Sequence, residues 1–195
     1  MYRQQLSNIL FRTSLDHKSS VLSCETLKEA HIYCKINQLS GQMAGCLIEN
    51  YIINKFEHMS KVKSSNCEGD CIHKNGSTIE IKISLGGKTH NKFNFVQIRL
   101  GHNIDFYLLT AYYLDKSNLG NDGELYTFFI DKHNMIDIIC NYGSYAHGTV
   151  GEYGKISKEN IREDCEYAIR PLYGSLLWSK LLEYRLTNSA LPIEF

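Results

Sequence analysis

Residues 68–84 read EGDCIHKNGSTIEIKIS. The sequence at 74–77, Lys-Asn-Gly-Ser, is typical of a hairpin turn, and the run at 78–84 alternates polar with β-branched residues, as a half-buried strand does. Such a hairpin brings Asp70 beside Glu80. Because side chains alternate across a strand, the three isoleucines of the run should pack in the core. The polar residues of the run should share the opposite face, where chemistry is possible: Thr78, Glu80, Lys82 and Ser84.

The rest of the chain predicts helices and strands that surround this hairpin. Apolar residues at helical spacing predict helices at 26–37, 40–59, 131–143 and 174–185. Aromatic and β-branched runs predict further strands at 93–99, 104–114 and 124–130. With 195 residues, 43% of them hydrophobic, the chain is long enough for one sizeable core. We expect a single α/β domain, residues 1–195, with a central mixed β-sheet of about five strands flanked by helices.

The charge of the chain is balanced, with 21 Lys and Arg residues against 21 Asp and Glu residues. No global field therefore points to a polyanionic partner, and any binding of nucleic acid must depend on local charge. The stretch 82–102 has no Asp or Glu and carries four basic residues: Lys82, Lys88, Lys92 and Arg99. This stretch is either a basic binding surface or an ordinary solvated loop.

The cysteines and the termini bear on the cellular compartment. Seven cysteines are scattered without the spacing of a disulfide framework, which favours reduced thiols. The N-terminus lacks the apolar run of a signal peptide, and no segment of about 18 apolar residues occurs. We therefore expect a soluble protein of the prokaryotic cytoplasm that has no membrane partner.

Paired carboxylates on one hairpin can bind a divalent metal ion. Magnesium prefers oxygen ligands and keeps several waters, so Asp70, Glu80 and the backbone carbonyl of Ile81 would suffice to hold it. Lys82, on the same face, could position or deprotonate the water that attacks a phosphodiester. Alternatively, these charges form an ordinary pair on an exposed strand. A zinc site with thiolate and imidazole ligands is a further alternative, formed by Cys67, Cys71, His73 and His58.

The carboxylates and lysine of this hairpin resemble the active-site motif of the PD-(D/E)XK nuclease superfamily, most closely that of the small type II restriction endonucleases. The residues that carry the resemblance are Asp70, Glu80, Ile81 and Lys82, with Glu49 in the preceding helix and Gln97, Ile98 and Arg99 on the following strand. The family's usual proline before the first Asp is Gly69 here. The resemblance covers roughly residues 40–114 and implies a restriction-endonuclease-like core. Residues 1–39 and 115–195 would supply recognition and dimerisation.

The resemblance implies a role for each matching residue. Asp70 and Glu80 would be the Mg²⁺ ligands, together with the backbone of Ile81, and Lys82 would be the catalytic lysine. Glu49 resembles the helix carboxylate that contacts a metal-bound water or a second ion; alternatively, it is a solvated helix residue. These assignments make Asp70, Glu80, Lys82 and Glu49 the candidate catalytic residues.

Reading a DNA sequence requires hydrogen-bonding side chains that reach base edges. The loops 86–92 and 142–149 carry such side chains, and their glycines permit a close approach. On the strand between them, Gln97 and Arg99 would share one face and could reach a phosphate, unless they are a plain surface pair. The candidate DNA-binding residues are Ser84, Lys88, His90, Asn91, Lys92, Gln97, Arg99, Tyr145, His147 and Thr149.

The leading expectation is a Mg²⁺-dependent restriction endonuclease that cuts double-stranded DNA at a short palindrome and leaves 5′-phosphate and 3′-hydroxyl ends. Such an enzyme would act as a homodimer, because two-fold protein symmetry matches a palindromic site. A cognate DNA methyltransferase would be its functional, not physical, partner. A structure-specific repair or recombination nuclease with the same active site, and a non-catalytic nucleic-acid-binding module, remain alternatives.

Overall fold

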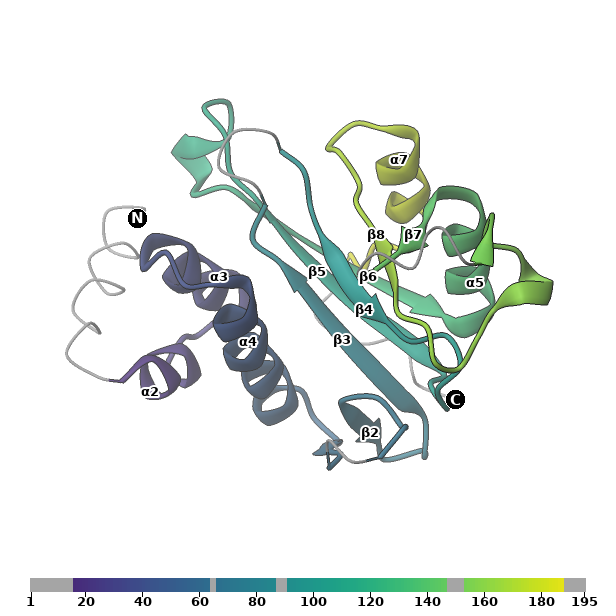
Figure 1. The fold of residues 1–195 in the computed structure, drawn as a ribbon. Coiled ribbons are helices and arrows are strands. Elements are labelled where there is room, and N and C mark those ends of the chain that lie inside the picture. The colour runs from purple at the N-terminus through teal and green to yellow at the C-terminus, as the bar shows by residue number, and fades with distance from the viewer. Residues whose placement is uncertain (1–15, 64–65, 87–90, 147–152, 188–195) are drawn as a thin grey trace.

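A computed structural model describes residues 16–63, 66–86, 91–146 and 153–187 of the chain. A five-stranded sheet with the strand order β1-β2-β3-β5-β6 lies at its centre (Figure 1). Strands β3 and β5 run parallel, and every other neighbouring pair of this sheet is antiparallel. The strands are β1 (Met59–Lys61), β2 (Cys71–His73), β3 (Thr78–Ser84), β5 (Phe106–Tyr113) and β6 (Glu124–Asp131). The strand that carries the candidate catalytic residues, β3, is therefore the central one.

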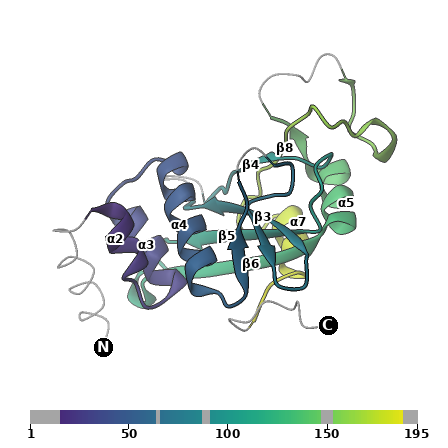
Figure 2. The ribbon, with the colours of Figure 1, turned by 90° about the horizontal axis from the view of Figure 1, so that it is seen from below.

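Three helices cover one face of this sheet (Figure 2). They are α2 (His17–Leu22), α3 (Leu27–Ile36) and α4 (Gly41–Lys55). Helices α3 and α4 begin after Thr26 and Ser40, whose hydroxyls accept hydrogen bonds from backbone N–H groups of the first turn. Against this layer pack Ile79 and Ile81 of β3. None of the helices in the described ranges is long and apolar enough to span a membrane.

The opposite face of the central sheet packs against a second layer of mixed structure (Figure 1). This layer contains a three-stranded sheet of order β4-β8-β7, formed by β4 (Phe95–Ile98), β7 (Ser144–Tyr145) and β8 (Tyr167–Ile169). It also contains helices α5 (Lys132–Tyr142) and α7 (Leu176–Leu182), and two short 3₁₀ turns, Leu119–Asn121 and Lys158–Asn160, lie in the connections. Trp178 of α7 stacks on Phe93 with their ring centroids 4.9 Å apart. Strands β3 and β5 thus lie between two cores.

The expected alternation holds on the two central strands. Ile79 and Ile81 belong to the core beneath the helices, so Glu80 and Lys82 point to the face that carries the second layer. The residue paired with Glu80 on β5 is Tyr107, which belongs to the core of that second layer. The prediction of an α/β fold around a mixed five-stranded sheet is therefore confirmed.

The strand predicted at 93–99 is present, but it is shorter than expected. Strand β4 belongs to the second sheet, not to the central one, and covers only four residues. Its pairing with β8 shifts between Phe95 and Ile98, because Gln97 adopts a left-handed conformation with φ of 57°. Phe95 and Ile98 are consequently both buried although they are three residues apart. The regular alternation that would put Gln97 and Arg99 on one face is therefore interrupted.

Candidate active site

The chain enters the site through a constrained turn at Gly69. Its φ is +75°, and a Cβ atom there would lie 2.7 Å from the carbonyl oxygen of Ile79. Proline holds φ near −65°, so it cannot adopt this conformation, and other side chains would collide with β3. The glycine that departs from the nuclease motif is thus required by the local backbone.

Asp70 follows this turn and continues the pairing of β2 with β3. Its backbone N–H donates to the carbonyl of Ile79 at 2.9 Å, and its side-chain Oδ2 accepts from the backbone N–H of Ile81 at 2.7 Å. The Asp70 side chain therefore takes the place of the next backbone hydrogen-bond partner of β3. The expected position of Asp70 beside Glu80 is confirmed, since Ile79 and Ile81 flank Glu80 on the strand.

Glu80 and Lys82 form an ion pair on the polar face of β3. The side chain of Glu80 is 5% exposed and that of Lys82 is 18% exposed, and Lys82 Nζ contacts Glu80 Oε1. Burial raises the pKa of the Glu80 carboxyl, and Asp70 adds to this rise, whereas Lys82 and Arg99 oppose it. Glu80 is therefore a buried carboxylate that needs nearby positive charge to remain ionised.

Glu49 reaches the same region from α4. It makes an ion pair with Lys61 of β1 at 3.1 Å, and its side chain is 21% exposed. Burial raises the pKa of Glu49, with a further rise from the charge of Asp70, while Lys61 and Lys82 lower it. The charges of Asp70 and Lys82 act on both Glu49 and Glu80, so the fold brings residues from three separate segments of the chain to one region.

Oxygen atoms at the open edge of β3 suit a hard divalent cation. The N–H and C=O of one strand residue point to the same side, so the Ile81 carbonyl is directed to the edge where Asp70 lies. Asp70 Oδ1 and the Glu80 carboxylate are the other oxygen donors, and two repelling carboxylates favour a cation between them. Within the described ranges, no three His, Cys, Asp or Glu side chains form a metal-holding group. A site here would therefore use two carboxylates, a carbonyl and water.

The zinc alternative finds no support in the described part of the chain. Cys71 is buried and its Sγ lies 3.3 Å from Met59 Sδ, whereas Cys67 is exposed. The rings of His58 and His73 have centroids 6.2 Å apart, and His73 Nδ1 is hydrogen-bonded to Asn75. The cysteines and histidines of the motif do not converge on one point, because Cys71 points into the helical core.

Two of the expected DNA contacts are buried. Ser84 is 7% exposed and its hydroxyl accepts a hydrogen bond from the backbone N–H of Asn94 at 3.0 Å. Tyr145 is 5% exposed in the core of the second layer, between Tyr153 and Tyr167. Both expectations are corrected: these side chains contribute to packing, because the segment of Asn94 covers Ser84 and the aromatic residues of the second layer cover Tyr145.

The other expected DNA contacts lie at different places. Asn91 contacts the Tyr113 hydroxyl, and Lys92 is exposed. Tyr113 is six residues along β5 from Tyr107, the partner of Glu80, so Asn91 lies roughly 20 Å from the carboxylates along the sheet. Gln97 is exposed and Arg99 is partly exposed. The remaining candidates lie outside the described residues: Lys88, His90, His147 and Thr149.

Two charged residues of the site region had no signal in the sequence. Lys61 pairs with Glu49, and Glu166 pairs with Arg99 at 2.8 Å. Glu166 lies 67 residues after Arg99 in the chain. Local spacing carries no information about such a contact, so only the tertiary structure identifies it.

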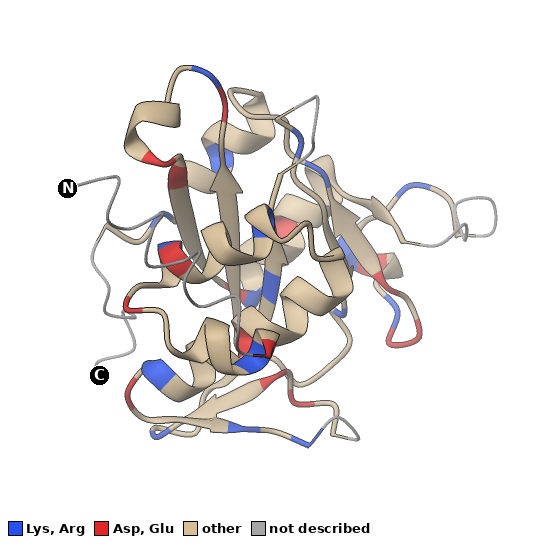
Figure 3. Ribbon diagram, turned by 90° about the vertical axis from the view of Figure 1, so that its left-hand side faces the viewer, with Lys and Arg blue, Asp and Glu red and all other residues tan. Residues whose placement is uncertain are grey.

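Charge is distributed evenly over the molecule, with acidic and basic residues interspersed along its elements (Figure 3). The sequence expectation that binding of a polyanion must depend on local charge therefore stands. The Lys82 and Arg99 side chains, both partly exposed near Glu80, supply such local charge.

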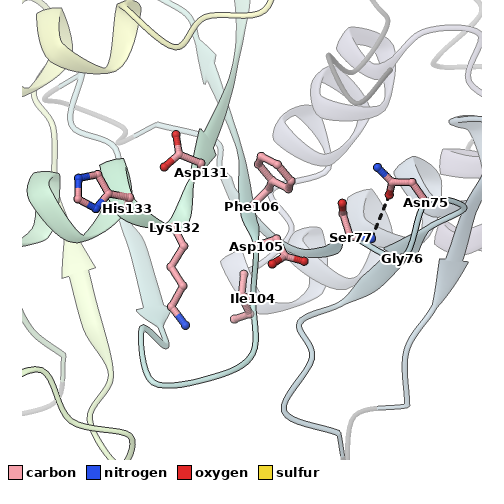
Figure 4. Close-up of a pocket in the computed structure, with 9 residues that line it drawn as sticks. All are labelled: Asn75, Gly76, Ser77, Ile104, Asp105, Phe106, Asp131, Lys132 and His133. Atoms are coloured by element: carbon pink, nitrogen blue, oxygen red, sulfur yellow. Dashed lines mark hydrogen bonds between the residues drawn. The ribbon is translucent and has the colours of Figure 1, made fainter. Parts of the chain in front are cut away.

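An open pocket of about 580 Å³ lies at the end of the sheet (Figure 4), and none of the four candidate catalytic side chains lines it. The turn before β3, the start of β5 and the start of α5 line it: Asn75, Gly76, Ser77, Ile104, Asp105, Phe106, Asp131, Lys132 and His133. Its polar groups are engaged within the protein. Asp105 accepts hydrogen bonds from the N–H and hydroxyl of Thr78, and Lys132 Nζ donates to the carbonyl of His102. The polar residues that line the pocket therefore connect the turn before β3 with the starts of β5 and α5.

Comparisons of this chain with protein families, with curated proteins and with solved structures find no match.

Proposed function

We propose that this protein is a Mg²⁺-dependent endodeoxyribonuclease of the PD-(D/E)XK type. The observation that supports the proposal is the convergence of Asp70, Glu80, Lys82 and Glu49, which come from a turn, a central strand and a helix. An ordinary exposed charge pair would not bury Glu80 or place the charge of Asp70 beside it. Perturbed carboxyl groups gathered in this way are typical of functional sites.

Asp70, Glu80 and the carbonyl of Ile81 would hold the magnesium ion. The ion would supply an activated water and neutralise charge on the phosphate. Lys82 has three N–H donors, and Glu80 uses one of them, so the others can orient the attacking water or a phosphate oxygen. Water adds to phosphorus as the bond to the 3′-oxygen breaks, and the leaving oxygen ends as a hydroxyl. The products would carry 5′-phosphate and 3′-hydroxyl ends.

The particular nuclease we propose is a type II restriction endonuclease that acts as a homodimer on a short palindrome. The second layer supports this choice, because its sheet, formed by β4 with β7 and β8 from beyond residue 114, lies beside the active-site face and could read DNA. All seven cysteines are free thiols, which suits the reducing cytoplasm of a prokaryotic cell. A cognate methyltransferase would protect the host DNA.

Incubation of the protein with long duplex DNA and Mg²⁺ tests the proposal. Discrete fragments support a restriction enzyme, while cleavage confined to branched substrates would indicate a repair or recombination nuclease. If neither duplex nor branched DNA is cut, the nuclease proposal is wrong. Asp70→Asn should abolish cleavage, and DNA binding in Ca²⁺ should persist. Glu183→Gln, which removes an exposed carboxylate at the end of α7, is the matched control and should cut normally.

A further inference from the structure

Arg99 and Glu166 pair across two neighbouring segments of the second layer: Arg99 directly follows β4, and Glu166 directly precedes β8, the strand with which β4 pairs. Both Nε and Nη2 of Arg99 donate to Oε1 of Glu166, at 3.1 and 2.8 Å. Glu166 immediately precedes β8, and its backbone carbonyl accepts a hydrogen bond from Ala146 of the neighbouring chain segment at 2.8 Å. The carboxylate that orients Arg99 is thus fixed from the second layer.

The backbone that carries Arg99 is also fixed. The Tyr107 hydroxyl donates to the carbonyl of Arg99 at 3.2 Å, and the N–H of Asn103 donates to the carbonyl of Cys67 at 2.9 Å. Between them, Gly101 lies so close to Glu163 that a Cβ atom would be 2.3 Å from its Cα. Only glycine permits this approach. The segment 99–103 is therefore clamped between the central sheet and the second layer.

This clamp holds the guanidinium within electrostatic reach of Glu80. Tyr107, whose hydroxyl holds the Arg99 carbonyl, is the β5 partner of Glu80 on the same face of the sheet. The charge of Arg99 acts on Glu80, whose carboxyl pKa it lowers. The side chain of Arg99 is 42% exposed, so a ligand can reach it from solvent.

The guanidinium retains donors for a ligand. It has five N–H groups, and the bonds to Glu166 use two of them, leaving the Nη1 edge without a partner among the described residues. A guanidinium can hold a carboxylate by one edge and a phosphate by the other. An oriented arginine loses less conformational entropy on binding than a free one.

We propose that Arg99 binds a DNA phosphate beside the scissile bond, and that Glu166 is a positioning residue that holds Arg99 for this contact. The inference rests on the proposed nuclease function and deepens it. It assigns a role to a segment beyond residue 115, outside the part that resembles the nuclease core.

The test compares Glu166→Gln with Arg99→Ala in duplex cleavage and in DNA binding with Ca²⁺ in place of Mg²⁺. Glu166→Gln removes the charge that orients Arg99 but leaves Arg99 in place. We expect kcat to fall about tenfold to 100-fold, because a phosphate contact shifted by about 1 Å has that effect. DNA affinity should be unchanged or tighter, since one negative charge is lost. Arg99→Ala should weaken binding and reduce the salt slope of log K by about 0.9, as expected for one lost phosphate contact.

The controls come from a second pair on the same segment. Arg162 and Asp164 make a similar exposed pair, with Arg162 Nε 3.0 Å from Asp164 Oδ1, and neither is among the charges that shift the pKa of Glu80. Asp164→Asn should leave kcat and DNA affinity unchanged, and Glu166→Asp, which keeps the charge, should recover part of the lost kcat.

Wild-type kcat in Glu166→Gln would overturn the inference while leaving the nuclease proposal intact. A parallel loss of kcat, DNA affinity and melting temperature in that variant would overturn it too, because it would show a purely structural role. If the wild-type protein itself neither binds nor cuts DNA, the nuclease proposal fails first, and the two failures remain distinguishable.

Discussion

The carboxylate of Asp70 accepts a hydrogen bond from the backbone N–H of Ile81 at 2.7 Å, so a side chain completes the edge of the central strand. This contact holds Asp70 next to Glu80 without any further side chain. Asp70 Oδ2 accepts this structural hydrogen bond, and Oδ1 stays available for a ligand.

The two uses of Asp70 can be separated by substitution. Asp70→Asn keeps an oxygen that can accept the Ile81 hydrogen bond, whereas Asp70→Ala removes it. We expect Asp70→Ala to lower the free energy of unfolding by about 1–2 kcal/mol relative to Asp70→Asn, while both lose cleavage. Chemical denaturation together with a plasmid-cleavage assay measures this. Equal stability of the two variants would contradict the structural role of the bond.

Substitutions at Gly69 should be more harmful than at the other glycine of the hairpin. Gly69 has a φ of +75° and no space for a Cβ, whereas Gly76 has a φ of +90° and nothing within 4 Å of its Cβ position. Gly76→Ala should therefore cost only backbone strain, about 1–3 kcal/mol, and Gly69→Ala should cost more because it adds a collision with β3. Gly69→Pro should be worse still. Denaturation midpoints measure the order, and a Gly69→Pro variant as stable as the wild type would contradict the structure.

A buried histidine makes stability depend on pH. His31 is fully buried between α3 and β5, with Nδ1 2.8 Å from the Leu27 carbonyl and Nε2 2.8 Å from the Thr110 hydroxyl. Burial lowers the pKa of His31 to about 4 from its usual 6.5. The unfolded chain therefore binds the proton more readily. The contribution of His31 to the free energy of unfolding should be fully present above pH 6.5. It should fall by up to about 3 kcal/mol as the pH drops toward 4.

Denaturation at several pH values tests the contribution of His31. A His31→Gln variant should be less stable at neutral pH, yet show a shallower loss of stability between pH 6.5 and 4. The exposed His133 is the control, and His133→Asn should keep the wild-type profile. An unchanged slope in His31→Gln would show that other groups cause the acid sensitivity.

Mg²⁺ should stabilise the folded protein in a manner that depends on Glu80. A ligand that binds only the native state raises the melting temperature, and a metal binds only the ionised carboxylate. Burial and Asp70 raise the pKa of Glu80, so the Mg²⁺-induced shift should disappear as the pH falls through this raised value, above the usual 4.5. At each pH, the melting temperature is compared with and without Mg²⁺, so the effect of His31 protonation, which is common to both measurements, cancels. Glu80→Gln should abolish the shift, and persistence of the shift in that variant would place the ion elsewhere.

Local sequence properties were sufficient for the hairpin and for strands β5 and β6, but not for β1, because the helix predicted at 40–59 ends at Lys55 and Met59 begins that strand. The turn at 74–77, the alternation of 78–84 and the helical spacing of α4 each arise within a few residues, so propensity and periodicity reveal them. They also placed Asp70, Glu80 and Lys82 on one face, since alternation in a strand is local geometry. Glu49 required the resemblance to nucleases, because nothing on its own helix indicates what it faces.

The sequence alone therefore determines the hairpin, the polar face of β3 and the α/β class of this protein, because short-range sterics and the burial of apolar residues set them. Only the tertiary structure moves β4 into a second sheet, turns Ser84 and Tyr145 inward, and pairs Arg99 with Glu166. Those features depend on contacts between residues far apart in the chain. The free energy that stabilises these contacts comes from packing two layers on one sheet, so local sequence patterns do not predict them.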